Sequence, residues 1–563
     1  MNSNTTEQAL NEAAQLFQAG NLDKAEDACL RLLEQSPEQP QALQLLGFIY
    51  FVKQDSDSAV DFLKRATDAA PDNIEAHFNL ARALEELGQF EQALSSYQTA
   101  HDCLPGDLDA INALGRLHTK LNNQEDAEFW FRQIIDHKPD QAAGHVNLGN
   151  ILSAQRRFKE AESCYRTAIE IDSQLAPAWN GLGRALSGQN RFSEAAEAIR
   201  QALTLNSDFV SAYINLGDTL KFSGDPVGAI DQYREALKRD PENTDAHFNL
   251  SLALLMSGDF NAGWPEYEWR WQWENFVSPK RQLPQSEWNG ESLDGKSVVA
   301  WGEQGIGDEI MFAGMLPDLI QETENVIVEC EPRLLPLFMR SFPNAAFLAK
   351  AEPAASELIN RSADYQIATG SLGRRYRQTL EAFPQHTSYL KTDPQTTQFY
   401  KEKYRGLFPD KRLIGISWKS GNEELGAARS ASLDLWQPVF EHADCAFINL
   451  QYGDVGTELQ AFTERSGIEI YIDGTVDPLK DMDKFAAQLS ALDLIISIDN
   501  STVHLAGALG MPTWTLLPTT PDWRWMLDVS ESPWYPAMQL IRQSSFGNWE
   551  EVFDKVSTAL TAH

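Results

Sequence analysis

The sequence predicts a superhelix of stacked α-helical pairs followed by two α/β units with parallel sheets. A 34-residue period, typical of helical repeats, runs through the first half of the chain. From Lys296 onward, short apolar runs alternate with helical segments, and this rhythm restarts at 412–418. We expect four regions: a repeat array over 1–275, a linker over 276–295, and α/β units over 296–400 and 401–563.

Composition limits the classes of partner. The 563 residues include 46 Lys and Arg and 81 Asp and Glu, so the formal net charge is −35. This charge argues against nucleic acid and anionic membrane as the main partner, because phosphate contacts need cations. No leader segment is evident, and no apolar run approaches the roughly 18 residues of a membrane span. The five cysteines form no CxxC pair, and we expect a cytoplasmic protein.

Three columns of residues recur at the repeat period, holding small residues, proline and leucine. Small residues let paired helices approach closely, and proline ends the second helix of each pair because it lacks an N–H. A single pair cannot bury its apolar face, so neighbouring pairs stack. The small column comprises Ala25, Ala59, Ala93, Ala127, Ala161, Ala195 and Ala229.

These columns resemble the tetratricopeptide repeat (TPR) family over roughly residues 6–275. The resemblance implies a concave surface that binds a protein acceptor. In the O-GlcNAc transferase type of TPR superhelix, a similar asparagine ladder holds the acceptor through its backbone amides. The alternative interpretation is hydrogen bonding between helices, or plain solvation. The peptide-binding candidates are Asn79, Asn147, Asn215 and Asn249, with Asn112 and Asn180 displaced by one place.

An aromatic segment ends the array. Residues 260–276 contain Trp264, Tyr267 and three further tryptophans. A helix that is aromatic on two sides must be covered on two sides, so this segment is predicted to pack between the array and the first α/β unit. A carbohydrate-stacking platform is the alternative interpretation.

Ligands of parallel sheets bind beyond the carboxyl ends of the strands, which directs attention to four loops. The first covers residues 301–312, where Gly305 and Gly307 allow a tight turn. Asp308 follows at the start of a helix, near the expected cleft. Its alternative role is a plain helix N-cap, which contributes about 1 kcal/mol to stability.

Cations follow the next strand, in the loop 418–432. Lys419 and Arg429 suit phosphate oxygens, and ordinary loop charge is the alternative interpretation. In the third loop, 492–518, a six-residue apolar run leads into a helix whose first hydroxyls and amides form an anion site, unless they only cap the helix. The candidates there are Asp499, Asn500, Ser501, Thr502 and His504.

Aromatic residues mark the fourth loop, 518–536. They would cover a sugar or a base, or they would pack in the core; the sequence favours neither. The donor-pocket candidates are Gln451, Trp523, Arg524 and Trp525.

Two segments, GIGDEIMFAGMLP and SIDNSTVHLAGALGMPTWTLLP, resemble the heptosyltransferase family of glycosyltransferases over about 295–560. The whole arrangement is similar to bacterial TPR-containing glycosyltransferases, including those that modify flagellin with nonulosonic sugars. The resemblance implies a GT-B fold of two Rossmann-like domains, an acceptor side with the catalytic base and a donor side. Asp308 matches the base, and Lys419 or Arg429 would contact the donor phosphate. Asp499, Ser501, Thr502 and His504 match the residues around the donor.

The resemblance implies inverting transfer of a sugar from a CMP- or UDP-linked donor to Ser or Thr of a protein, with flagellin as one candidate acceptor. No metal or other cofactor is expected, since the DMD triplet at 481–483 is better interpreted as a helix start. Two alternatives stay open: an inert TPR scaffold with a degenerate transferase domain, and a transferase acting on a glycan or lipid-linked acceptor. The sequence leaves the donor, the acceptor and the oligomeric state undetermined.

Overall fold

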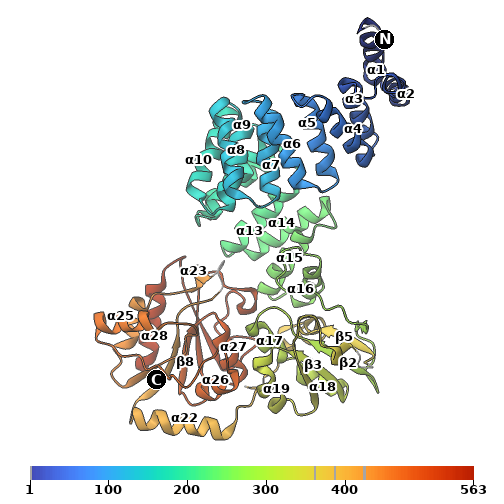
Figure 1. The fold of residues 1–563 in the computed structure, drawn as a ribbon. Helices are drawn as coiled ribbons and strands as arrows, with labels where there is room; N and C mark the ends of the chain where they lie inside the picture. The colour runs from blue at the N-terminus through green and yellow to red at the C-terminus, as the bar shows by residue number, and fades with distance from the viewer. Residues whose placement is uncertain (1–2, 360–362, 386–387, 422–425, 563) are drawn as a thin grey trace. The chain divides into compact units, whose positions relative to one another are not determined.

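The structure is a computed structural model that describes residues 3–359, 363–385, 388–421 and 426–562 (Figure 1). Its contacts divide the chain into two compact units, Met1–Asn215 and Leu216–His563, each of which is described by itself. The predicted succession of helical pairs and then parallel sheets is confirmed. Within the described ranges, no helix is both long and apolar enough to cross a membrane.

Helical pairs make up the first unit. Its helices are α1 (Ser3–Gln18), α2 (Leu22–Gln35), α3 (Pro40–Val52), α4 (Ser56–Ala69), α5 (Ile74–Glu86), α6 (Phe90–Cys103), α7 (Leu108–Lys120), α8 (Gln124–His137), α9 (Ala142–Ala154), α10 (Phe158–Ile171), α11 (Ala176–Ser187), α12 (Phe192–Leu205) and α13 (Val210–Phe222), which continues into the second unit. The small-residue column lies on the second helix of each pair, where Ala59 and Ala127 are fully buried. A Cβ atom added at Gly149 would lie 2.8 Å from the Tyr165 ring, so the close approach of α9 and α10 requires glycine there.

Three helices continue the array at the start of the second unit. They are α14 (Pro226–Arg239), α15 (Thr244–Met256) and α16 (Phe260–Tyr267), followed by the 3-10 helix η1 (Glu268–Trp271). Trp264 and Tyr267 are only 1% and 2% exposed, which confirms the predicted packing role of the aromatic segment. Trp264 Nε1 donates a hydrogen bond to the Arg377 carbonyl at 2.7 Å. The end of the array therefore shares a core with the α/β region.

The first sheet is parallel throughout, in the order β1-β5-β2-β3-β4. Its strands are β1 (Ser286–Glu287), β2 (Ser297–Trp301), β3 (Asn325–Cys330), β4 (Ala345–Ala349) and β5 (Tyr365–Ala368). The segment 276–295, predicted as a linker, supplies β1 and also Arg281, which forms a buried ion pair with Glu329 at 2.9 Å. A two-residue edge strand contains no apolar run, so the hydrophobic pattern could not reveal it.

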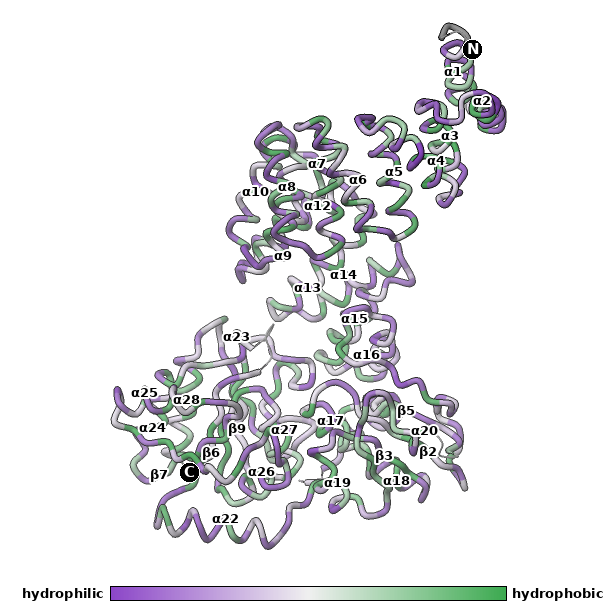
Figure 2. The backbone as a smooth tube through the Cα atoms, in the orientation of Figure 1, coloured by the Kyte–Doolittle hydropathy of each residue, from purple (hydrophilic) through white to green (hydrophobic). Residues whose placement is uncertain are grey.

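The second sheet is also parallel, in the order β10-β9-β8-β6-β7. Its strands are β6 (Arg412–Ser417), β7 (Cys445–Asn449), β8 (Leu494–Ile498), β9 (Thr513–Leu517) and β10 (Met538–Arg542). Every residue of β8 and β9 is buried, and aliphatic and aromatic side chains predominate in both strands. Figure 2 shows hydrophobic segments in the region of β6 and β9. Strands buried along their whole length are typical of a sheet covered on both faces.

Short helices connect the strands. The α-helices are α17 (Ile306–Ala313), α18 (Leu316–Glu322), α19 (Leu335–Ser341), α20 (Ser356–Ile359), α21 (Gly373–Tyr376), α22 (Pro394–Leu407), α23 (Gly426–Arg429), α24 (Gln437–Phe440), α25 (Gly456–Ser466), α26 (Met482–Leu489), α27 (Ser501–Ala508) and α28 (Trp549–Ala562). The 3-10 helices are η2 (Pro332–Leu334), η3 (Thr369–Leu372), η4 (Leu380–Ala382), η5 (Leu433–Trp436) and η6 (Trp523–Trp525). Helix α22 crosses the expected boundary at 401 and packs on α26, where Gln488 Nε2 donates to the Tyr404 hydroxyl at 2.9 Å.

The winding of each sheet reverses at a central strand. Strand β2 lies between β3 and β5, and β6 lies between β7 and β8. A crevice opens beyond the carboxyl ends of strands at such a reversal. Helices α17 and α27, which follow β2 and β8, pack against each other. This packing brings the loops at the carboxyl ends of the two sheets together.

Candidate active site

Asp308 lies in the first turn of α17, directly after the central strand of the first sheet. One carboxylate oxygen, Oδ2, accepts a hydrogen bond from the Gly305 N–H at 3.2 Å, so Asp308 lies at the third helical position and contacts the N-cap residue Gly305 instead of being the N-cap itself. The other, Oδ1, accepts a hydrogen bond from Arg524 Nη2 at 2.8 Å. The Asp308 side chain is 14% exposed. The carboxylate thus caps its helix and also contacts the fourth loop.

A chain of ion pairs connects this carboxylate to the loop after β8. Arg524 Nε lies 3.0 Å from Asp522 Oδ1, and Arg429 Nη2 lies 3.3 Å from Asp522 Oδ2. Arg429 Nη1 then lies 3.0 Å from Asp499 Oδ2. Three carboxylates and two guanidiniums therefore alternate across the junction of the two α/β halves. The first and third loops thus lie close together, and these side chains occupy the space between them, where the sequence analysis expected an open cleft.

Burial and the neighbouring charges shift the pKa values of the groups in this cluster. Burial raises the pKa of Asp308, and the Arg524 guanidinium opposes that shift. Burial also acts to raise the pKa of Asp522, but Arg524 and Arg429 outweigh it, so the net pKa is lowered. Burial, and then Arg524, lower the pKa of His504 well below its ordinary value, so the imidazole is neutral. A partly buried carboxylate beside a cation is chemically able to accept a proton from a hydroxyl group.

His504 and Gly307 form the contact between α17 and α27. A Cβ atom at Gly307 would lie 3.0 Å from His504 Cδ2, so glycine allows these helices to approach without a shift of the imidazole. The imidazole stacks on Trp525 at 5.2 Å between ring centroids, and its Nδ1 lies 2.9 Å from the Tyr535 hydroxyl. His504 is 2% exposed. In this structure its visible role is packing.

Asn500 ties the start of α27 to the end of β6 in the second sheet. Its Oδ1 accepts a hydrogen bond from the Thr502 N–H at 3.0 Å, and its Nδ2 donates to Ser417 Oγ at 2.7 Å. The Thr502 hydroxyl is fully buried and makes no hydrogen bond with any described residue. Ser501 is half-buried. The N-terminal turn of α27 therefore holds one fixed amide and one hydroxyl able to accept a further partner.

Gln451, two residues after the end of β7, holds the start of the loop that follows β6. Its Oε1 accepts hydrogen bonds from Ser417 Oγ, the Trp418 N–H and the Lys419 N–H at 2.8–3.0 Å. The Lys419 side chain instead lies beside Glu458 on α25, 2.7 Å away, and is 48% exposed. Of the two predicted phosphate-binding cations, only Arg429 reaches the ion-pair chain.

A pocket of about 530 Å³ adjoins Gln451 at the carboxyl edge of the second sheet. It is lined by residues 449–456 and 472–479, except Thr475, together with Phe485 and Gln488. Asp473 is 4% exposed there and accepts hydrogen bonds from Lys403 Nζ at 2.7 Å and the Tyr404 hydroxyl at 2.8 Å. Of the residues that line this pocket, only Gln451 was among the donor-pocket candidates, although glycines and a proline after β7 and after Ile472 mark both of its loops.

The tryptophans of the fourth loop lie in the core. Trp523 is 5% exposed and its ring centroid lies 5.6 Å from that of Trp264. Trp525 is fully buried against His504. Of the two interpretations of these rings, core packing is the one present in the structure. They position Arg524, which lies between them.

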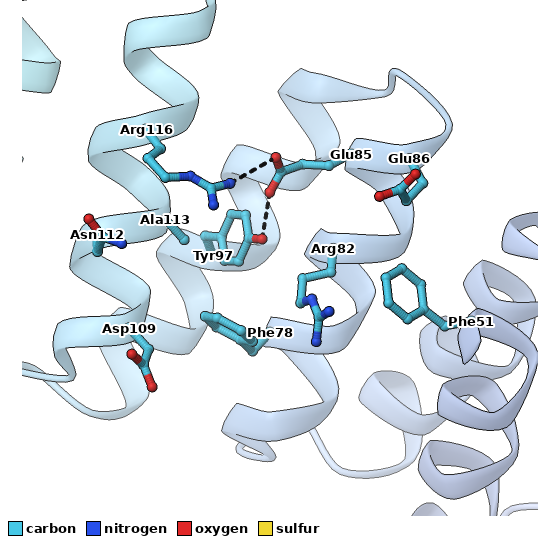
Figure 3. Close-up of a pocket in the computed structure, with 10 residues that line it drawn as sticks. All are labelled: Phe51, Phe78, Arg82, Glu85, Glu86, Tyr97, Asp109, Asn112, Ala113 and Arg116. Atoms are coloured by element: carbon cyan, nitrogen blue, oxygen red, sulfur yellow. Dashed lines mark hydrogen bonds and ion pairs between the residues drawn. The ribbon is translucent and has the colours of Figure 1, made fainter. Parts of the chain in front are cut away.

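The first unit contains a separate pocket of about 350 Å³, formed by three successive first helices of the repeats, α3, α5 and α7, with Tyr97 from α6 (Figure 3). Glu85 is held by the Tyr97 hydroxyl at 2.6 Å and by Arg116 Nη2 at 3.4 Å. The Arg82 guanidinium lies 4.7 Å from the centroid of the Phe51 ring. The remaining lining residues are Phe78, Glu86, Asp109, Asn112 and Ala113.

The asparagine columns make hydrogen bonds along the array. Asn147 Nδ2 donates to Asn112 Oδ1 at 3.3 Å, and Asn215 Nδ2 donates to Asn180 Oδ1 at 3.0 Å. Asn249 Oδ1 accepts from Lys221 Nζ at 3.0 Å, and Asn79 is half-buried. The displaced Asn112 and Asn180 are thus partners of the regular column, a relation that the one-place shift in the sequence concealed.

Comparison with known families defines the class of protein. Tetratricopeptide repeat profiles match residues 84–148, 140–208 and 214–262, and a profile described as anaphase-promoting complex, cyclosome, subunit 3 matches residues 18–100. These matches agree with the observed helical pairs. The chain is a tetratricopeptide repeat protein, with an N-terminal TPR superhelix followed by a region of parallel sheets and helices.

The chain is similar to Protein FlbA of Caulobacter vibrioides, with 35% identity over 311 residues, 53% of this chain and 52% of that protein. The match thus spans about half the length of the relative. Among solved structures, a tetratricopeptide repeat protein from Parabacteroides merdae has 18% identity and a TM-score of 0.37, covering 45% of this chain and all of that one. YrrB, described as a TPR protein with an unusual peptide-binding site, has 18% identity and a TM-score of 0.27, covering 33% and 95%.

Proposed function

We propose that the chain is an inverting protein O-glycosyltransferase of the GT-B type. The TPR superhelix recruits a polypeptide, and the two α/β halves transfer a sugar from a nucleotide-sugar donor to a Ser or Thr hydroxyl. The observation that carries the proposal is the position of Asp308, a mostly buried carboxylate where the carboxyl edges of the two sheets meet. Inverting transfer needs a base at such a place, with cations near the leaving phosphate.

The chemistry assigns a role to each side of the junction. Asp308 accepts the proton of the acceptor hydroxyl as its oxygen attacks the anomeric carbon of the sugar. The bond from that carbon to the phosphate oxygen breaks, and the departing nucleotide carries the added negative charge. Arg429 and the N-terminal turn of α27 neutralise that charge, because a guanidinium and free backbone N–H groups both bind phosphate. The donor phosphate replaces Asp499 and Asp522 as the partner of Arg429.

The donor nucleoside occupies the pocket beside Gln451. Its volume of about 530 Å³ lies within the usual range for small-molecule sites. CMP- and UDP-linked sugars are the candidate donors. Flagellin as acceptor and a nonulosonic acid as the sugar rest on the resemblance to flagellin glycosyltransferases alone.

The acceptor polypeptide binds along the first helices of the repeats. The support is the pocket around Phe51, Phe78 and Arg82, because an aromatic wall with adjacent charged and amide groups suits an extended peptide. Asn112 borders that pocket. Its partner Asn147 continues the same amide row into the next repeat.

A mass measurement tests the proposal. Purified chain is incubated with flagellin and with CMP- or UDP-linked sugars, and the acceptor is weighed intact. We expect a sugar mass on flagellin with the wild type, and its loss with Asp308→Asn, which keeps the side-chain shape. Asp434→Asn, at an exposed ion pair with Arg465, is the matched control and should retain activity.

A second measurement separates this function from that of an inert scaffold. The scaffold is the alternative that the ion pairs in the junction favour, because their side chains occupy the space between the loops. Thermal unfolding is followed with CMP, UDP, GDP and ADP. A stabilising shift with one nucleotide, retained in Asp308→Asn, supports a donor site. The absence of any shift and of any mass increase would leave the scaffold as the function. Transfer to a glycan or lipid-linked acceptor, with none to protein, would assign the array to assembly instead.

A further inference from the structure

The segment 520–526 is held on one side by the last helices of the array and contacts Asp308 on the other. Thr520 Oγ1 donates a hydrogen bond to the Phe222 carbonyl, at the end of α13, at 3.0 Å. The Trp523 ring packs edge-on against Trp264 of α16. The next residue, Arg524, donates to Asp308.

We propose that Arg524 is a positioning residue for Asp308, and that the final helices of the array set the place of Arg524 through Trp523. This inference rests on the proposed function, because it assigns Asp308 the role of base. It gives the TPR superhelix a part in the chemistry in addition to recruiting the acceptor. Arg524 is the side chain that we assign to orienting the base.

The geometry at Asp308 fits a held base. Arg524 occupies Oδ1 at 2.8 Å, and the Gly305 N–H occupies Oδ2 at 3.2 Å. Two donors on different oxygens fix both the position and the rotation of a carboxylate. Each carboxylate oxygen accepts more than one hydrogen bond, so a lone pair stays available for the acceptor hydroxyl. Fixing a reacting group in this way contributes to rate by orientation.

Arg524 is itself held from several directions. Its Nε lies 3.0 Å from Asp522 Oδ1, and its backbone N–H donates to the same carboxylate at 3.4 Å. Trp523, only 5% exposed, packs against both Trp264 and Tyr267, whose ring centroids are 5.6 and 6.0 Å away. The backbone that carries Arg524 is therefore anchored to the end of the array through the neighbouring Trp523.

The charged groups around Asp308 give this role a distinct signature. Besides burial, Arg524 lowers and Asp522 raises the pKa of Asp308. Burial, and with it the Asp308 carboxylate, raises the pKa of Tyr267 and Tyr535, and the neutral His504 adjoins the helix of Asp308 at Gly307. Burial raises the pKa of the carboxyl, and Arg524 is the cation that opposes it. Without the guanidinium, the pKa of Asp308 rises further and the base form is present only at higher pH.

The test uses full-length Arg524→Gln, Arg524→Lys and Trp523→Leu, with Arg465→Gln, at an exposed pair on α25, as the control. Sugar transfer is measured against pH, and kcat and the donor KM are separated. For Arg524→Gln at pH 7 we expect kcat to fall by about tenfold or more with little change in donor KM. In the same variant, the acidic limb of kcat/KM should move to higher pH by about one unit. Arg524→Lys should restore part of the kcat and part of the pH shift.

Trp523→Leu should reproduce the kcat loss in weaker form, and Arg465→Gln should match the wild type. A raised donor KM with unchanged kcat in Arg524→Gln would make Arg524 a donor-binding residue and overturn the inference alone. An unchanged acidic limb would do the same. A wild type without transfer activity would overturn the proposed function and this inference together. Thermal unfolding of Asp308→Asn, Arg524→Gln and the double variant checks their coupling without activity, and additive effects would also overturn it.

Discussion

Arg270 and Glu303 form a two-point ion pair with no exposed side-chain surface: Nε lies 2.9 Å from Oε2 and Nη2 lies 2.8 Å from Oε1. Arg270 belongs to the last turn of the array, and Glu303 follows the central strand of the first sheet. The Glu303 carboxylate also accepts the Gly370 N–H at 2.9 Å. The pair thus fixes the loop that leads to Asp308 onto the end of the array.

Removal of one member of this pair should destabilise the second unit strongly. Arg270→Met leaves the Glu303 carboxylate buried without its cation, and we expect a loss of about 3–5 kcal/mol in the free energy of unfolding. Urea unfolding followed by tryptophan fluorescence measures it. The double variant Arg270→Met/Glu303→Leu removes the buried charge and should recover part of the loss. A single variant as stable as the wild type would show that the pair is not needed.

Glu309 should make stability depend on pH. Burial raises its pKa from 4.5 to about 7. The folded protein therefore binds this proton more tightly than the unfolded chain does. The contribution of the protonated Glu309 to the free energy of unfolding is fully present below pH 4.5 and is lost as the pH rises through about 7. Glu309→Gln mimics the protonated form. The stability of the wild type relative to the variant should fall by about 3 kcal/mol between pH 4.5 and 8.

Thermal unfolding of the wild type and Glu309→Gln at a series of pH values measures this difference. Glu531→Gln, which removes an exposed carboxylate, serves as the control for the substitution itself. Parallel curves for the wild type and Glu309→Gln would contradict the prediction.

A substitution in the pocket of the array should raise the acceptor KM and leave donor hydrolysis unchanged. Phe78 forms part of its aromatic wall and lies 5.2 Å from Tyr97 between ring centroids. Phe78→Ala should raise the acceptor KM by about tenfold, the loss expected for one buried aromatic contact, with donor hydrolysis unchanged. Phe129→Ala, which removes a ring that is 54% exposed and outside the pocket, is the control. Equal acceptor KM values in all three proteins would place recruitment elsewhere.

Transfer should continue without a divalent metal. Among the described residues, no three His, Cys, Asp or Glu side chains gather in a way that would hold a metal ion. The DMD triplet is a helix start, since Asp481 caps α26 by accepting the Lys484 N–H at 2.9 Å. We expect turnover in excess EDTA to stay within about twofold of the untreated rate, because guanidinium groups supply the positive charge. Loss of turnover that Mn²⁺ restores would contradict this.

The repeat period made the first half of the fold predictable. Small residues such as Ala59 must be buried where two helices meet, and this requirement recurs at each period. Most of the buried strands of both sheets were also visible as apolar runs. Strands β1, β5 and β10 were not predicted, because β1 has only two residues, β5 is a four-residue strand that contains the polar Gln366, and Met538–Arg542 is half-exposed.

The site was predicted less completely than the fold. A loop at the carboxyl end of a strand is a local feature, so Asp308 and the start of α27 could be named from the sequence. Ion pairs between loops are not local: the contact of Arg524 with Asp308 joins positions 216 residues apart. Lys419 was predicted from its position after a strand, but its side chain forms an ion pair with Glu458 on α25. That long-range contact could not be predicted from the local sequence.

The last helices of the array share a core with the sheets, and this limits how the array can vary in length. Repeats within residues 1–215 contact neighbouring repeats of that unit, so adding or deleting one there alters reach and leaves the α/β core intact. The pairs that carry Phe222, Trp264 and Arg270 have no such freedom, because each contacts a loop of the α/β region. A chimera that receives a foreign repeat array should therefore be joined ahead of Val210, where α13 begins, with the terminal helices kept from this chain.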